Sequence, residues 1–271
     1  YNETMVELKL LSQASSAGMG KCNEDLLGYF RTRAWALDGA TDLKQTFVPS
    51  GWTSGAKWLV SQIDLLMRSD LAFTSLADLL PRAASSVDQE LQLLGYDSSQ
   101  YIPPAASFGA VDLLDKRVQI RVVGDIYVYW HQGNRLYTNE VFEQNEKAAM
   151  RTAMRATSPS EDGILERRRR YIEANGAESI LSNKTAIHQG GLSASIVANS
   201  GDVIVMATDG AARAVTDYAI YSSWADFTDA ALARGAAEVM TKIRAFEKDA
   251  VTSERFKKAD DAAIALYEVA E

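Results

Sequence analysis

The sequence predicts a single domain of mixed α+β structure. Short apolar and β-branched runs typical of strands occur near both ends and in the middle of the chain, and two long apolar stripes with helical spacing lie between the first strands and the central ones. Nothing in the composition of the 271 residues marks a boundary between domains. Residues 1–271 are therefore expected to form one domain.

Strands are expected wherever polar and apolar residues alternate or an apolar run is bounded by turn residues. Residues 105–114 and 118–123 have the pattern of a hairpin, whereas residues 12–20 are small and polar and are expected to form a loop. The predicted strands are residues 4–11, 26–30, 33–38, 105–114, 118–123, 123–130, 193–198, 202–209 and 262–269.

Helices are expected where apolar residues recur every three or four positions after a capping residue. Ser54 is the predicted cap of a helix through residue 67, and Thr74 or Ser75 of a second helix that continues to Gly95. Further helices are predicted for residues 140–156, from a capping box at residues 158–161 as far as residue 175, and in two pieces between residues 226 and 248. The apolar stripes of these helices are core positions rather than ligand contacts.

The composition excludes several classes of function. Hydrophobic residues make up 47% of the chain and charged residues 24%, which is typical of a globular protein with a large core. The net charge of -8 argues against nucleic acid as a partner, because binding to phosphates needs clustered Lys and Arg. No apolar stretch approaches the roughly 18 residues of a membrane span, so no membrane partner is expected. Cys22 is the single cysteine, which favours a reducing compartment, and we expect a cytoplasmic monomer.

Two apolar runs end in the same dipeptide. Residues 33–37 lead into Asp38-Gly39, and residues 203–208 lead into Asp209-Gly210. Each run is typical of a buried strand that carries a carboxylate to its end. In a chain with two histidines and one cysteine, this pattern indicates an all-oxygen site for Mg²⁺ or Mn²⁺ rather than Zn²⁺. The alternative is that each Asp-Gly simply forms a turn.

Further acids accompany these two strand ends. Glu24-Asp25 lies between two predicted strands, Asp125 follows a glycine within the central strands, and Asp260-Asp261 precedes the last strand. In order and spacing, the complete set of acids resembles the metal-dependent serine/threonine protein phosphatases of type 2C, the PPM family, as found in bacteria. The resemblance extends from about residue 12 to residue 269.

This resemblance implies a four-layer α/β/β/α sandwich with two antiparallel β-sheets and a flap region at about residues 139–190. It also implies a site for two Mn²⁺ or Mg²⁺ ions at one edge of the sheets. Asp38 would bridge the two ions, the Gly39 carbonyl would bind one of them, and Asp209 and Asp260 would bind the other. Asp125 would hold a weaker third ion together with Asp209.

The remaining site residues include two departures from the family. Glu24 and Asp25 match the acidic pair that acts on the metals largely through coordinated water. The family arginine that grips the substrate phosphate is replaced by Gly20, so Lys21 beside it is the candidate phosphate contact, as a point charge without the fork of a guanidinium. Arg213 stands where the family commonly has an aspartate, which weakens the case for a third ion and makes Arg213 a second candidate phosphate contact.

The chemistry expected is hydrolysis of phosphoserine and phosphothreonine in a phosphorylated protein by a water that bridges two cations. Two such ions lower the pKa of the water and stabilise charge at phosphorus, so no protein nucleophile is required. Two alternatives stay open. One is a catalytically weak or inactive binding protein of the same fold, and the other is a phosphatase of a small phosphorylated metabolite.

Four consecutive arginines, at positions 167–170, lie in the predicted flap. Such a run is most often a solvated helix face. The functional alternative is a patch that recruits a phosphorylated or acidic partner.

Overall fold

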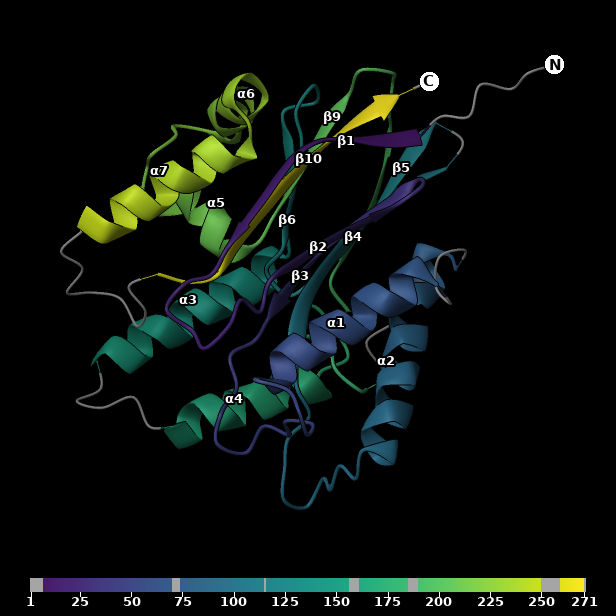
Figure 1. The fold of residues 1–271 in the computed structure, drawn as a ribbon, viewed down its shortest axis with the longest axis vertical. Helices are drawn as coiled ribbons and strands as arrows, with labels where there is room; N and C mark the ends of the chain where they lie inside the picture. Colours follow the sequence, from purple (N-terminus) through teal and green to yellow (C-terminus); the bar gives the residue numbers. More distant parts are fainter. Residues whose placement is uncertain are drawn as a thin grey trace.

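The computed structural model describes residues 7–69, 74–114, 116–155, 161–184, 190–249 and 259–270. Within these ranges the chain forms two five-stranded sheets, packed face to face (Figure 1). The strand order is β1-β10-β9-β6-β7 in the first sheet and β2-β3-β4-β5-β8 in the second. The strands are β1 (Glu7–Ser16), β2 (Leu26–Phe30), β3 (Arg33–Gly39), β4 (Ala106–Leu114), β5 (Arg117–Val123), β6 (Tyr127–Trp130), β7 (Arg135–Tyr137), β8 (Leu192–Val197), β9 (Val203–Ala207) and β10 (Ala262–Ala270).

All neighbouring strands within the two sheets run antiparallel. Alternate side chains therefore point into the space between the sheets, where Tyr267 and Ile204 of the first sheet join Ala36 and Val111 of the second in one buried cluster. The predicted pair of antiparallel sheets is confirmed.

Helices cover both outer faces of this sandwich (Figure 1). The second sheet is covered by α1 (Gly55–Arg68) and α2 (Leu76–Leu93), whose caps are Ser54 and Ser75 as predicted. The first sheet is covered by α5 (Asp209–Thr216), α6 (Trp224–Arg234) and α7 (Ala236–Asp249). The order of layers is therefore α/β/β/α, which confirms the predicted fold.

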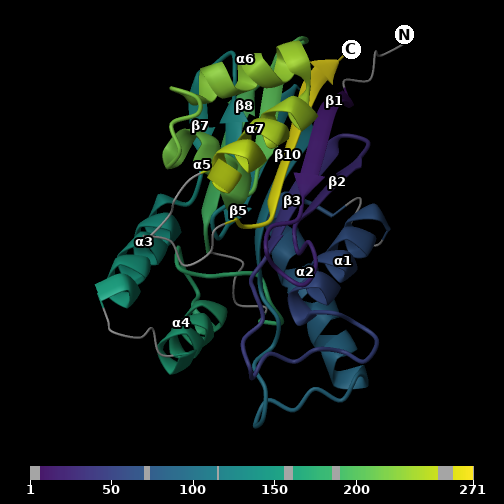
Figure 2. The same ribbon diagram turned by 60° about the vertical axis from the view of Figure 1, so that its left-hand side comes forward.

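Two more helices lie in the region predicted to be the flap. Figure 2 shows α3 (Glu140–Arg155) and α4 (Glu161–Glu173) beside the lower end of the sandwich, where β10 begins. Phe142 of α3 and Tyr171 of α4 meet in a small buried cluster with Ala105, just before β4. Most of the predicted capping box at residues 158–161 lies outside the described residues.

Two predictions of local structure are wrong. The loop expected from residue 12 starts only after Ser16, because Ser12 to Ser16 continue β1 as an edge strand paired with β10. The polar side chains there alternate between partly buried and exposed positions, as an edge strand permits. The strand expected to reach Asp209 stops at Ala207, and Asp209 instead begins α5.

No helix in the described ranges is long and apolar enough to cross a bilayer.

Candidate metal centre

The two sheets bring together acids that are far apart in the sequence. Asp38 lies near the end of β3 in the second sheet, whereas Asp209 follows β9 and Asp260 precedes β10 in the first sheet. Because β9 and β10 are antiparallel, the end of one lies beside the start of the other. Asp125 lies between β5 and β6, where the chain passes from the second sheet to the first. The acids thus gather at one end of the sandwich.

The glycine after each strand-end aspartate permits a close approach rather than a turn. Gly39 is still part of β3, and a Cβ there would lie 2.8 Å from Cβ of Glu24. Gly210 lies in the first turn of α5, and a Cβ there would lie 1.9 Å from the backbone oxygen of Asp261. Neither glycine has a positive φ. The interpretation of the two Asp-Gly pairs as turns is therefore wrong, and both glycines let neighbouring acidic segments come close.

Asp25 is the most deeply buried acid of this group, with 4% of its surface exposed. The Thr208 hydroxyl donates to Asp25 Oδ2 over 2.6 Å and accepts from the backbone N–H of Ala263 over 2.9 Å. Asp25 Oδ1 is buried and has no hydrogen-bond partner. Burial raises the pKa of Asp25 well above its ordinary value, and the charges of Asp209 and Asp261 raise it further, whereas the Thr208 hydrogen bond opposes the shift.

Asp38 and Asp125 show the same mutual repulsion. Burial is the largest cause that raises the pKa of Asp38 well above its ordinary value. The charges of Asp25, Asp209 and Asp125 raise it further. Burial and the charge of Asp209 raise the pKa of Asp125 to about 7, although Ser107 Oγ donates to Asp125 Oδ1 over 2.5 Å. These shifts have the physical cause expected when carboxylates share a site without a cation between them.

The side of the centre formed by Asp209 and Asp260 contains its own cation. Arg213 Nη2 donates to Asp209 Oδ2 over 2.9 Å and to Asp260 Oδ2 over 3.2 Å. The charge of Asp209 raises the pKa of Arg213, with burial opposing this and Asp260 adding to it. Two carboxylates at the same end of the β9–β10 pair are thus joined through one guanidinium nitrogen.

The carboxylates of Asp261 and Glu24 are each held by hydrogen bonds from neighbouring segments. Asp261 accepts from the backbone N–H groups of Gly18 and Glu24, over 2.7 and 2.6 Å, and so joins the segment before β2 to the start of β10. The Glu24 carboxylate accepts from the hydroxyl of Ser54, which also caps α1. The contacts of Thr208 with Asp25 and of Ser54 with Glu24 were not predicted, since these partners lie at distant positions of the chain.

One arginine of the flap reaches the segment that follows Asp38-Gly39. Arg168 Nη1 donates to the backbone oxygens of Ala40 and Thr41 over 3.1 and 3.4 Å, and burial lowers the pKa of Arg168. The interpretation of residues 167–170 as a solvated face is therefore wrong for Arg168. Asp42 accepts from the backbone N–H of Gly55 over 2.7 Å. Burial raises the pKa of Asp42, and the charges of Arg168 and Lys21 both lower it. Lys21 itself is exposed.

The described residues fit a divalent cation on one side of the centre and not on the other. Nowhere in the described ranges do three His, Cys, Asp or Glu side chains already stand close enough together to hold a metal ion. On the Asp38 side, the unpartnered oxygen of Asp25 and the raised pKa values of Asp38 and Asp125 are what a missing positive charge produces. On the other side, Asp209 and Asp260 are already paired with Arg213. The third ion at Asp125 stays a prediction.

Comparisons with solved structures identify this fold. The chain is similar to the serine/threonine phosphatase PstP/Ppp of Mycobacterium tuberculosis, with a TM-score of 0.58, 13% identity and coverage of 98% of this chain and 100% of that one. It is similar to the catalytic domain of PstP in complex with two manganese ions, with a TM-score of 0.55, 13% identity and coverage of 98% and 100%. It is also similar to the PPM Ser-Thr phosphatase MsPP of Mycobacterium smegmatis in complex with cacodylate, with a TM-score of 0.56, 15% identity and coverage of 96% and 99%.

The chain therefore has the fold of the bacterial PPM-type serine/threonine phosphatases. No protein-family model matches the sequence, and no curated protein sequence matches it. At this level of identity the similarity establishes the fold alone.

Proposed function

We propose that the chain is a PPM-type phosphatase domain that uses Mn²⁺ or Mg²⁺ to hydrolyse phosphoserine and phosphothreonine in proteins. The observation that carries the proposal is the convergence of Asp25, Asp38, Asp125, Asp209 and Asp260 at one end of the sandwich, each delivered by a different strand end or connection. The fold adds support, because a solved structure with the same fold contains two manganese ions.

Each residue of the Asp38 side has a distinct part in this proposal. Asp38 and the Gly39 carbonyl would hold a divalent cation, and Glu24 and Asp25 would orient the waters around it. Such an ion supplies a Lewis acid that lowers the pKa of a bound water and stabilises negative charge on a phosphoryl oxygen. Thr208 fixes one oxygen of Asp25 and leaves the other free to accept a hydrogen bond from water.

The substrate phosphate would be met by positive charge from the chain itself. Lys21 is exposed and its charge lowers the pKa of Asp42, and Arg213 pairs with Asp209 and Asp260. Residues 139–190 would act as the flap beside the site, with Arg168 fixing the segment after Gly39. We also propose that the protein acts as a monomer in the cytoplasm, where the single cysteine, Cys22, would remain reduced.

Release of phosphate from a phosphopeptide in the presence of Mn²⁺ tests this function. The wild type should be active, Asp38→Asn should lose at least about 100-fold in kcat/KM because it loses a metal ligand, and both should lose activity with a chelator. Asp97→Asn is the matched control, since the side chain of Asp97 is only half-buried and its printed hydrogen bonds in the described structure go to its near neighbours Ser99 and Gln100. A wild type without metal-dependent turnover on phosphopeptides or sugar phosphates would defeat the proposal, and preference for sugar phosphates would indicate a metabolite phosphatase.

A second candidate function is a binding protein that keeps the fold and has lost turnover. The observation that favours it is the pair of ion pairs made by Arg213, because they engage two of the acids that the resemblance assigns to a metal. Phosphopeptide binding in calorimetry without phosphate release would support this candidate over the enzyme.

A further inference from the structure

The side chain of Arg213 is built into the centre from several directions. It is 13% exposed, and its position on α5 is one helical turn after Asp209, so the two side chains lie on the same helix face. The Tyr218 hydroxyl also hydrogen-bonds with Arg213 and raises its pKa. The guanidinium is thus held by the helix, by both carboxylates and by Tyr218.

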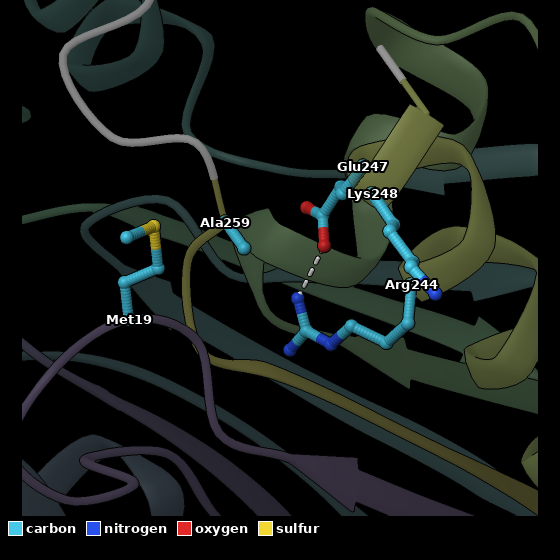
Figure 3. Close-up of a pocket in the computed structure, with 5 residues that line it drawn as sticks. All are labelled: Met19, Arg244, Glu247, Lys248 and Ala259. Atoms are coloured by element: carbon cyan, nitrogen blue, oxygen red, sulfur yellow. Dashed lines mark hydrogen bonds and ion pairs between the residues drawn. The ribbon is translucent and has the colours of Figure 1, made fainter.

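A second layer of contacts supports Tyr218. Its hydroxyl donates to Oε1 of Glu247 over 2.8 Å, and Glu247 is 2% exposed. Arg244 pairs with the other carboxylate oxygen of Glu247 over 2.6 Å and also donates to the backbone oxygen of Ser16 over 2.7 Å. Figure 3 shows this pair in the hollow that it lines with Met19, Lys248 and Ala259. Both carboxylate oxygens of Glu247 accept hydrogen bonds there, from Tyr218 and Arg244. We therefore interpret these residues as support for Tyr218 and Arg213 rather than as a separate binding site.

We propose that the guanidinium of Arg213 is a built-in cation that replaces one of two divalent ions, so that the wild-type centre binds one exchangeable divalent cation, on its Asp38 side. The inference rests on the proposed function in that it takes the acidic centre to be a cation site. It goes beyond that function because it fixes how many ions the centre takes and which residue sets the number.

The charge balance explains why one half needs an ion and the other does not. Arg213 supplies the positive charge that Asp209 and Asp260 require in order to remain ionised side by side. A divalent ion at the same two carboxylates would have to displace the guanidinium, because two cations a few ångströms apart in a partly buried site repel strongly. Displacement would also leave Arg213 buried next to Tyr218 without its carboxylates, which is costly for a charged group.

The Asp38 side has no equivalent cation. Among the described residues, no lysine or arginine pairs with Asp25, Asp38 or Asp125, and Oδ1 of the buried Asp25 has no partner. One monovalent guanidinium cannot neutralise five aspartates, namely Asp25, Asp38, Asp125, Asp209 and Asp260. A divalent cation is therefore still required, and the Asp38 side is where the charge is missing.

Counting bound Mn²⁺ tests the inference without reference to turnover. Isothermal titration calorimetry should give one Mn²⁺ per wild-type chain and two per chain of Arg213→Ala, because the substitution frees Asp209 and Asp260 as ligands. Electron paramagnetic resonance of the loaded proteins should show the spectrum of an isolated Mn²⁺ for the wild type and a spin-coupled pair for Arg213→Ala. Arg213→Lys, which keeps the charge, should still bind one ion.

The controls separate this inference from the proposed function. Arg234→Ala removes an exposed arginine at the end of α6 and should bind one ion like the wild type. Arg213→Gln keeps most of the side-chain volume and gives a second route to two ions if Arg213→Ala does not fold. Two ions in the wild type, none in the wild type, or equal numbers in the wild type and both neutral variants would overturn the inference. A protein that binds the predicted numbers of ions and releases no phosphate would defeat the proposed function and leave the inference standing.

Discussion

The acidic centre has two halves that differ in how their negative charge is balanced. On the β9–β10 side, Asp209 and Asp260 share the guanidinium of Arg213. On the Asp38 side, burial raises the pKa values of Asp38 and Asp25, and the charge of Asp25 raises that of Asp38 further. The comparison teaches that a row of acids at strand ends does not by itself determine how many ions a site takes, because a single arginine nearby can pair with two of the acids.

A buried arginine in the core, Arg33, can be compared with Arg213 in the acidic centre. Arg33 and Asp112 pair between β3 and β4 with side chains 5% and 3% exposed, and Arg33 also donates to the backbone oxygen of Thr74 over 2.6 Å. Arg33→Met should reduce the free energy of unfolding by about 3–5 kcal/mol, because it leaves a buried carboxylate without its partner. Urea unfolding with and without Mn²⁺ measures the effect, which added metal should not relieve.

Arg213→Met is the matched variant for this test. It should destabilise the metal-free protein as well, but Mn²⁺ should restore most of the loss, since an ion can take the place of the guanidinium between Asp209 and Asp260. If Mn²⁺ restored the free energy of unfolding equally in both variants, or in neither, Arg213 would not differ from a structural arginine such as Arg33, and the proposal that it takes the place of a divalent ion would be contradicted.

The two halves should also respond differently to the loss of one carboxylate. Asp38→Asn should weaken Mn²⁺ binding by roughly 100-fold, because it removes a ligand of the exchangeable ion. Asp260→Asn should change the affinity by less than about threefold, because Arg213 keeps its contact with Asp209. Calorimetric titration of both variants checks this contrast, and similar losses in the two would mean that both halves bind metal.

A smaller effect is expected from the flap. Arg168→Ala should lower kcat/KM by about tenfold and leave Mn²⁺ affinity unchanged, because it releases the backbone oxygens of Ala40 and Thr41, which follow the proposed metal ligands Asp38 and Gly39. Arg170→Ala is the control, since Arg170 is exposed and pairs with Glu178 at 3.8 Å. A loss of metal affinity in Arg168→Ala would place this arginine inside the metal site rather than beside it.

The smallest predicted effect is a dependence of stability on pH. Asp125 has a pKa of about 7 in the folded protein, above that of an unfolded aspartate near 4, so the folded state binds more protons between these values. The stabilisation is complete below about pH 4 and is lost as the pH rises through about 7. The melting temperature of the metal-free protein should therefore fall by several degrees between pH 5 and pH 8 in differential scanning calorimetry.

Metal should remove most of this slope, because a cation lowers the pKa of the carboxylates that it faces. A melting temperature that rises with pH in the metal-free protein would show that these acids are already compensated. Asp125→Asn should flatten the profile in the absence of metal, which separates its contribution from that of Asp25 and Asp38.

The individual strands and helices could be predicted from local patterns in the sequence, whereas their arrangement in four layers was predicted only from the resemblance to a known family. Alternation along residues 105–123 and apolar stripes after Ser54 and Ser75 need no knowledge of distant residues, and the corresponding hairpin and helices are present. The short helix α5 was missed because its first residues, Asp209-Gly210, also suit the end of a strand. The grouping of the acids at one site was likewise predicted from the resemblance that their order and spacing carry.

The pairing inside the centre could not be predicted in the same way. Asp209 and Arg213 are four residues apart, so their contact was accessible from helical spacing, but only if the helix itself had been recognised. Asp260 is 47 residues from Arg213, and Arg168 is 128 residues from Ala40, so both contacts depend on the tertiary fold. The role of Arg213 as a counter-ion thus depends on the packing of the two sheets and could not be predicted from the sequence alone.

The location of metal in a crystal soaked with Mn²⁺ tests the account most directly. Anomalous diffraction should show one strong peak, beside Asp38 and the carbonyl of Gly39, with Arg213 still bonded to Asp209 and Asp260. Two strong peaks on either side of Asp38, with Arg213 turned away from both carboxylates, would contradict it.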